Sequence, residues 1–224
     1  LSKSDLVIIE PMAFSNQELA LVQESKTTIV GYVSLMELEN WNTELKKQVI
    51  DSDYAIQKGK QIYIEEWDTY IMDIREPHYR DVLLWKINHM IVERKMDGVF
   101  FDTVDDLEYY FRDDPRIVKE MQIAFVTLLH DLERLHPELL IIQNRGFKTY
   151  QEETHRLVDG VLWEDFQANN KKEEQWTNKW TAFFKREQFW GRVKVFTVVS
   201  DKPSKQLSLN NKFTPFVRLN NTYQ

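Results

Sequence analysis

Two six-residue stretches decide the expected fold: residues 97–102 read Asp-Gly-Val-Phe-Phe-Asp, and residues 159–164 read Asp-Gly-Val-Leu-Trp-Glu. In each, a turn dipeptide precedes a short apolar run that ends in a carboxylate. An unbroken apolar run of this length is typical of a strand buried on both faces, as in a parallel sheet covered by helices. Because side chains alternate across a strand, Asp102 and Glu164 would each project from one face at a C-terminal strand end. Parallel α/β folds place their chemistry at these ends.

Apolar, β-branched runs alternate with helical patterns along the whole chain. Strands are expected at residues 6–10, 29–35, 70–74, 99–103, 139–144, 161–165, 194–200 and 215–219. The clearest helices are expected at residues 78–95 and 115–135, where apolar residues form a broad stripe. The alternation predicts an α/β fold, a single (β/α)8 TIM-type barrel that forms one catalytic domain over residues 1–224. A doubly wound open sheet is the main alternative, although no glycine-rich phosphate loop follows any expected strand.

Composition narrows the function further. The net charge of −7 disfavours a nucleic-acid binder that depends on phosphate contacts. No stretch approaches the roughly 20 apolar residues of a membrane span. The absence of cysteine excludes disulfides, thiolate catalysis and cysteine-ligated metals. Because the chain starts at Leu1 and strand-like sequence begins almost at once, we expect a removed upstream segment, an extracellular or cell-surface location, and a monomer.

Polar residues close nearly all of the expected strands. The residues concerned are acids and one amide: Glu10, Glu37, Asp73, Asp102, Asn144, Glu164 and Asp201. Any one of them has an ordinary structural explanation, since strand ends meet water and loop caps favour Asp and Asn. In a barrel, however, all of them would converge on one rim, which that explanation does not require.

Within this set, Asp102 and Glu164 most resemble acid/base machinery. Glycoside hydrolysis needs one carboxyl group to protonate the leaving oxygen and a second to attack the sugar or activate water. Barrel geometry could set the two carboxyl groups roughly 5–10 Å apart at the rim, within the range that both hydrolytic mechanisms use; a retaining mechanism would place them about 5–6 Å apart across one cleft. Several aromatic side chains could offer faces for sugar rings, and we expect two or three of them to touch a ligand: Trp41, Trp67, Tyr79, Tyr109, Tyr110 and Trp163.

Other chemistries fit the residues less well. Asp102, Asp105 and Asp106 could form a metal-binding cluster, or Asp105 or Asp106 could instead cap a short helix through Tyr110. The five histidines show no metal-ligand spacing and anchor no Ser-His-Asp arrangement. We therefore expect no metal and no cofactor.

The chain resembles the glycoside hydrolase family 114 group of endo-α-1,4-polygalactosaminidase-like proteins. The resemblance covers nearly the whole sequence, and the motifs that carry it are residues 5–11, 31–34 with Glu37 and Glu39, Trp67, 72–74, 96–105, 143–146 and 159–165. The first strand ends in Glu10 where the family commonly has Asp, and residues 35–37 read Leu-Met-Glu where it often has Gly before Glu.

The resemblance implies a barrel that acts on an α-1,4-linked, galactosamine-rich polysaccharide. It matches Asp102 and Glu164 to the family's catalytic acids, with Asp102 as the expected nucleophile and Glu164 as the acid/base. Together with the strand ends, it assigns these residues to substrate binding: Glu10, Tyr32, Glu37, Asp73, Asp105, Asn144 and Asp201. The alternative is a non-catalytic carbohydrate-binding barrel that keeps the cleft but lacks turnover.

Overall fold

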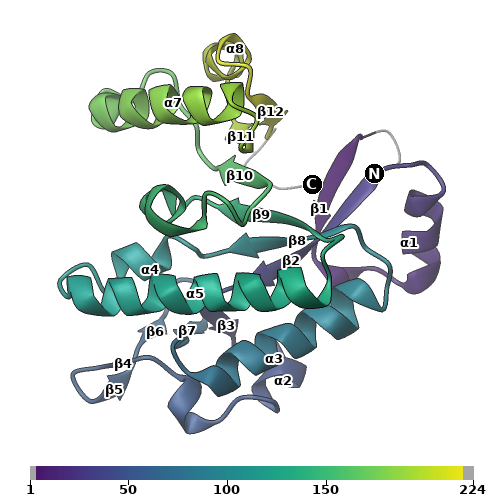
Figure 1. Cartoon of the computed structure of the whole chain (residues 1–224), viewed down its shortest axis with the longest axis vertical. Coiled ribbons are helices and arrows are strands. Elements are labelled where there is room, and N and C mark those ends of the chain that lie inside the picture. Colours follow the sequence, from purple (N-terminus) through teal and green to yellow (C-terminus); the bar gives the residue numbers. More distant parts are fainter. Residues whose placement is uncertain (1–3, 219–224) are drawn as a thin grey trace.

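The computed structural model describes residues 4–218 and centres on a parallel sheet (Figure 1). Its seven strands run in the order β1-β2-β8-β9-β10-β11-β12, and each neighbouring pair is parallel. The strands are β1 (Leu6–Ile9), β2 (Thr28–Ser34), β8 (Gly98–Asp102), β9 (Leu140–Asn144), β10 (Gly160–Trp163), β11 (Lys194–Val199) and β12 (Thr214–Val217). The last residue of the expected strand 215–219, Leu219, lies outside the described residues.

The aspartates of the two Asp-Gly pairs at the start of β8 and β10 make equivalent hydrogen bonds. The Asp97 carboxylate accepts the backbone N–H of Ile29 at 2.7 Å, and the Asp159 carboxylate accepts that of Ile141 at 2.8 Å. In both cases the aspartate backbone also bonds to the two flanking strands. Each aspartate therefore joins three strands at their N-terminal ends and sets their register.

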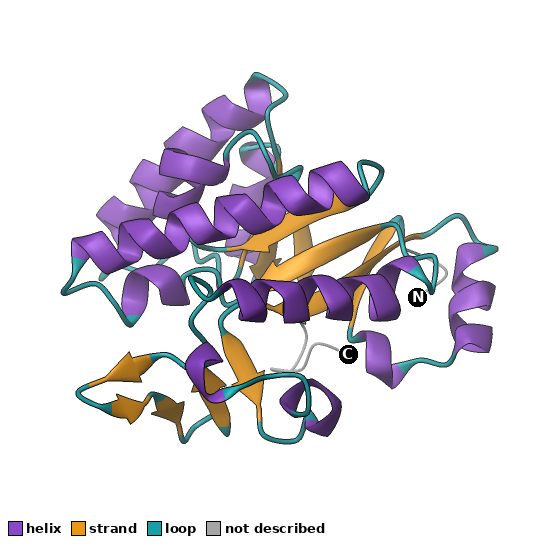
Figure 2. Ribbon diagram, turned by 60° about the horizontal axis from the view of Figure 1, so that its bottom comes forward, coloured by secondary structure: helices purple, strands orange, loops and turns teal. Residues whose placement is uncertain are grey.

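Helices cover one face of this sheet (Figure 2). The longer ones are α1 (Asn16–Gln23), α3 (Pro77–Ile87), α5 (Pro115–Leu135), α7 (Glu174–Phe189) and α8 (Lys202–Asn210), and the short ones are α2 (Thr43–Lys46), α4 (Asp106–Tyr109) and α6 (Phe147–Thr149). Single π-type turns, Asn88–Val92 and Tyr150–Thr154, continue α3 and α6. The helices expected at 78–95 and 115–135 are thus present. Among the described helices, none is long and apolar enough to cross a membrane.

The alternation of side chains along each strand separates two apolar clusters. Val99 and Phe101 of β8 join the main core, which lies between the sheet and the helices. Phe100 belongs instead to a smaller cluster with Val30, Ile142, Leu162 and Val198 from four neighbouring strands. We call the face that carries this second cluster the inner face. Residues in phase with the cluster at the C-terminal strand ends therefore point to a common region.

The prediction of a barrel strand at residues 70–74 is wrong. The segment forms β7 (Thr69–Ile71), which pairs antiparallel with β3 (Glu37–Glu39) and β6 (Tyr63–Ile64) in a separate three-stranded sheet. Between β3 and β6, the strands β4 (Ile56–Gln57) and β5 (Lys60–Gln61) form a hairpin. Its turn is Lys58-Gly59, and φ is positive at both residues.

The local pairing explains the difference. β7 has partners on both edges, β3 and β6; β6 is close in sequence, so that pair forms with little loop-closure cost, and no edge of β7 is left for the main sheet. β2 and β8 then pair directly, with Ser34 opposite Asp102. The described residues therefore place seven parallel strands in the main sheet, where the sequence predicted eight.

Candidate active site

The inner face brings four of the predicted site residues to one edge of the sheet. Asp102 and Asn144 are the last residues of β8 and β9, and Tyr32 lies opposite Phe100 on β2. Glu164 directly follows β10, in phase with Leu162 of the inner cluster. Leu162 is opposite Asn144, so only β9 separates the strands that carry the two acids. The predicted distance between their carboxyl groups stays a prediction.

Asp102 is held by three hydrogen bonds. The Tyr32 hydroxyl donates to its Oδ2 at 2.9 Å, and the Asn144 amide donates to its Oδ1 at 2.7 Å. The backbone N–H of Thr103 donates to the same Oδ1 at 2.8 Å. Burial and the charge of Asp102 raise the pKa of Tyr32 far above its ordinary value, so this hydroxyl remains a donor. Three donors thus orient the Asp102 carboxylate.

Asn144 has one polar atom left without a partner. The side chain is 3% exposed, and its Oδ1 is buried with no hydrogen-bond donor among the described residues. The bond from Nδ2 to Asp102 determines which end of the amide faces the carboxylate, so Oδ1 is the free acceptor. A buried acceptor without a donor costs about 1–3 kcal/mol, and a ligand hydroxyl or ammonium would satisfy it.

A left-handed residue follows each of the three central strand ends. Thr103 has φ 60°, Arg145 φ 51° and Asp165 φ 50°, each directly after Asp102, Asn144 or Glu164. Such conformations are uncommon for residues other than glycine and cluster at functional sites. The chain therefore bends sharply just after each candidate residue. No sequence rule predicts this conformation for a threonine or an arginine, so sequence reasoning missed it.

Further acids adjoin Asp102 and Tyr32. Glu10 is in phase with Ile8 of the inner face; its carboxylate accepts the Met12 N–H, and burial raises its pKa. Glu37 begins β3, where its carboxylate accepts the Thr69 hydroxyl at 2.7 Å.

Asp106 shares a hydrogen bond with Glu37. Burial, then repulsion from Glu37, raises the pKa of Asp106 to about 9. The Oδ2 atom of Asp106 is buried and has no hydrogen-bond partner among the described residues.

Three predicted binding residues have structural partners. Asp73 is 8% exposed and forms a two-pronged ion pair with Arg75, at 2.6 and 2.9 Å. Asp201 is the N-cap of α8, where it accepts the Ser204 N–H at 2.6 Å. Asp105 precedes α4 but makes no side-chain cap bond; its carboxylate pairs with Arg145 at 3.2 Å. Their part in substrate binding stays a prediction.

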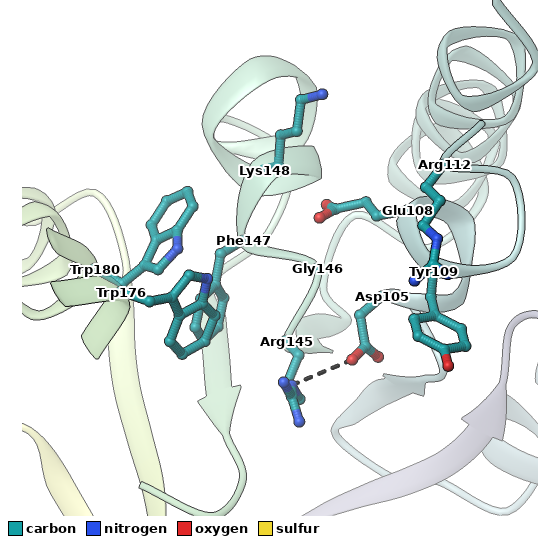
Figure 3. A pocket seen from close by; sticks show the side chains of 10 residues that line it. All are labelled: Asp105, Glu108, Tyr109, Arg112, Arg145, Gly146, Phe147, Lys148, Trp176 and Trp180. Atoms are coloured by element: carbon teal, nitrogen blue, oxygen red, sulfur yellow. Dashed lines mark ion pairs between the residues drawn. The ribbon is translucent and has the colours of Figure 1, made fainter. Parts of the chain in front are cut away.

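A cleft of about 230 Å³ lies beside the segments that follow β8 and β9 (Figure 3). We call it the α4–α7 cleft. Its lining comes from α4 and its flanking residues, from the loop after β9 with the start of α6, and from α7, and comprises Asp105, Glu108, Tyr109, Arg112, Arg145, Gly146, Phe147, Lys148, Trp176 and Trp180. Of the aromatic residues expected to face sugar, only Tyr109 lines it, while Tyr79 and Trp163 are buried. Sequence reasoning missed Trp176, although its position in the aromatic-rich α7 was a usable signal.

Solved structures share this architecture at low sequence identity. The glycoside hydrolase domain of PelA from Pseudomonas aeruginosa matches 98% of this chain and 89% of its own, with a TM-score of 0.77 and 18% identity. Aspergillus fumigatus Ega3, solved in complex with galactosamine, matches 96% and 84%, with a TM-score of 0.70 and 14% identity. An α-galactosidase from Thermus thermophilus matches 91% and 46%, with a TM-score of 0.61 and 11% identity. The fold is therefore that of TIM-barrel glycoside hydrolases.

The family itself follows from the sequence. The sequence model of glycoside-hydrolase family GH114 matches residues 2–217, so the chain belongs to this family. Among curated proteins, no sequence matches the chain. The predicted family and fold class are thus confirmed.

Proposed function

We propose that this glycoside hydrolase cleaves an α-1,4-linked, galactosamine-containing polysaccharide with a retaining, two-carboxylate mechanism. The observation that carries the proposal is the arrangement of Asp102: a carboxylate held by Tyr32 and Asn144 beside a buried acceptor, Asn144 Oδ1, that lacks a donor. A sugar hydroxyl or ammonium bound there would satisfy this acceptor while the anomeric carbon approaches Asp102.

The surroundings of Asp102 support its role in this mechanism. Asp102 accepts three hydrogen bonds, which hold its carboxylate in one orientation. It therefore suits the nucleophile, which attacks the anomeric carbon and forms a glycosyl ester. Glu164, from the next strand but one, would donate a proton to the leaving oxygen. It would then take a proton from the water that hydrolyses the ester.

The acids around this pair support an amino sugar as substrate. Glu10, Glu37, Asp106 and Glu39 are within electrostatic reach of Tyr32, Asp102 or one another. A protonated amino group placed among them would offset their mutual repulsion. The match to Ega3, a structure that holds galactosamine, is in keeping with this substrate class. The assignment of Glu10 and Glu37 to substrate binding rests on this argument.

A paired mutation experiment tests the function. The protein is incubated with α-1,4-linked galactosaminogalactan, and new reducing ends are measured. We expect Glu164→Gln and Asp102→Asn to lower kcat at least about 1000-fold, because each removes a group that acts in the transition state. Asp81→Asn, which changes an exposed acid on α3, serves as the control and should retain activity within about threefold.

The outcomes separate two functions. Turnover that survives both substitutions would refute the assigned acids. Binding of the polymer without turnover by the unmodified protein would instead establish the non-catalytic carbohydrate-binding barrel. The anomeric configuration of the first product, followed by NMR, tests retention.

The same proposal includes the setting of the enzyme. A polymeric substrate is met outside the cell, so we place the protein in the extracellular space or on the cell surface. We further propose that the chain acts as a monomer and as one catalytic domain. Light scattering of the purified protein tests the oligomeric state.

A further inference from the structure

We propose that the α4–α7 cleft is a separate sugar subsite that selects an uncharged residue, a hexose or an N-acetylhexosamine, and disfavours one with a free ammonium group. The inference rests on the proposed function, because it assigns a second sugar residue of the same polymer. Neither Asp102 nor Glu164 lines this cleft, so it is a neighbour of the active site and not part of it.

Two aromatic side chains flank the cleft from opposite sides (Figure 3). Tyr109 of α4 is 60% exposed, and Trp176 of α7 is 38% exposed. Phe147 stacks on Trp176 with ring centroids 5.4 Å apart, which holds the indole in place. The apolar C–H faces of a sugar ring pack well against such rings. With about 230 Å³, the cleft is smaller than the roughly 300–1,000 Å³ of drug-sized sites, so it suits a single ring.

A polar pair lies between the aromatic side chains. Arg145 Nε is 3.2 Å from Asp105 Oδ2, and both side chains are more than one-third exposed. A guanidinium donor beside a carboxylate acceptor can bind neighbouring hydroxyl or amide groups of one sugar. Because the two charges already offset each other, the pair favours an uncharged ligand over an ion.

The charges in the lining disfavour an ammonium group. Three cations, Arg112, Arg145 and Lys148, face two acids, Asp105 and Glu108. Both acids are engaged: Asp105 pairs with Arg145, and Glu108 accepts the backbone N–H and the hydroxyl of Thr149. Lys148 lies 3.9 Å from Glu152, so the selection rests on the two lining acids: a protonated amino sugar would find both of them already bonded to other groups.

The charges at the adjoining strand ends differ from those in the cleft, and this difference would let the two regions bind different sugar residues. Asp106 is within electrostatic reach of both Asp102 and Glu37, and Glu10 and Asp102 both act on Tyr32. The two regions are also connected: Arg145 directly follows Asn144, and Trp176 packs against Trp163, the residue before Glu164. A polymer strand that occupies both regions would place an ammonium-bearing residue at the acids and an uncharged residue in the cleft.

Single substitutions of the two aromatic residues test this subsite. Trp176→Ala and Tyr109→Ala are compared on α-1,4-linked galactosamine oligomers that are either fully deacetylated or partly N-acetylated. We expect each variant to lose about tenfold in kcat/KM on the partly acetylated oligomer, the factor for roughly 1.4 kcal/mol of lost ring contact. On the fully deacetylated oligomer the change should stay within about twofold. Trp190→Ala, which removes a 64% exposed tryptophan at the end of the same helix, is the control.

A binding experiment keeps this proposal distinct from the proposed function. N-acetylgalactosamine oligomers are titrated calorimetrically into the Glu164→Gln variant, with and without Trp176→Ala. Binding that weakens with Trp176→Ala supports the subsite even if the protein shows no turnover. Equal loss on both oligomers, or no binding of the acetylated oligomer, would overturn it. Tighter binding of the fully deacetylated oligomer through Trp176 would refute the charge selection.

Discussion

At the scale of single residues, the site depends on side chains that fix the backbone as well as on those that would touch substrate. Thr103 has φ 60°, a costly conformation for a β-branched residue, and its position is stabilised by its own hydroxyl. Thr103 Oγ1 accepts the Met36 N–H at 2.9 Å and lies 3.2 Å from Ser34 Oγ. These contacts join the end of β8 to the segment after β2 and so position Asp102.

Replacing the Thr103 hydroxyl tests this role. Thr103→Val keeps the shape but leaves the Met36 N–H without an acceptor, so we expect the free energy of unfolding to fall by about 1–3 kcal/mol. Thr103→Ser keeps the hydroxyl and should cost less than about 1 kcal/mol. Urea denaturation measures both, and equal effects of the two variants would show that the hydroxyl is not what stabilises the turn.

The Asp106–Glu37 pair makes a second prediction at this scale. The pKa of Asp106 is raised from 3.8 in an exposed carboxyl group to about 9. Between these values the unfolded chain releases a proton that the folded chain retains, so ionisation of Asp106 lowers stability as pH rises towards 9. Asp106→Asn removes this penalty and still donates to Glu37. The free energy of unfolding of the variant, measured relative to that of the unmodified protein, should therefore rise by about 1 kcal/mol or more between about pH 5 and pH 8.

Thermal unfolding at several pH values measures this gain. Asp113→Asn is the matched control, since it changes an exposed acid in the following loop. A gain that is the same at all pH values would show that the Asp106 carboxyl group does not retain its proton in the folded state.

At the scale of elements, β8 and β10 have similar sequences and both begin at the glycine of an Asp-Gly pair. The atoms that surround the two glycines differ in how easily they can move. A Cβ atom added at Gly98 would lie 2.5 Å from the backbone oxygen of Leu140, the residue opposite it on β9. At Gly160 the nearest atoms are side-chain carbons of Phe196 and Ile142, at 3.0 and 3.2 Å. Backbone atoms held in a sheet cannot move aside as side chains can.

Alanine substitution should reveal this difference. We expect Gly98→Ala to lower the free energy of unfolding by about 3 kcal/mol, and Gly160→Ala by about 1 kcal/mol, because overpacking costs more where backbone must shift. Chemical denaturation of the two variants is the measurement. A larger effect at Gly160 would show that the aromatic ring of Phe196 is the less adaptable neighbour.

At the scale of the whole molecule, the central strands β8 and β9 of the parallel sheet are buried and paired on both edges, whereas the strands at its two ends have fewer partners. β8 lies between β2 and β9, and three of its residues, Val99, Phe100 and Phe101, are at most 5% exposed. Among the described residues, β1 and β12 each have one sheet partner, and β12 has no fully buried position. The sheet is therefore expected to open from these ends.

Hydrogen exchange followed by mass spectrometry measures that order of opening. Amides of β8 and β9 should exchange most slowly, and those of β12 at least about 100-fold faster, since edge strands open with less free energy than the core. Equal protection of β1, β12 and β8 would show instead that the first and last strands pair and close the barrel in solution.

The sequence by itself determined the family, the α/β fold class and the strands that carry Asp102, Asn144 and Glu164, because buried parallel strands show up as apolar runs that end in polar residues. Only the tertiary structure decided that residues 69–71 leave the barrel for a local antiparallel sheet, since strand pairing depends on which edges are free. It also decided the Asp102 donors, the left-handed turns and the α4–α7 cleft. The donors and the cleft join side chains that are distant in sequence, and the left-handed turns occur at residues other than glycine, so no local pattern could predict these features.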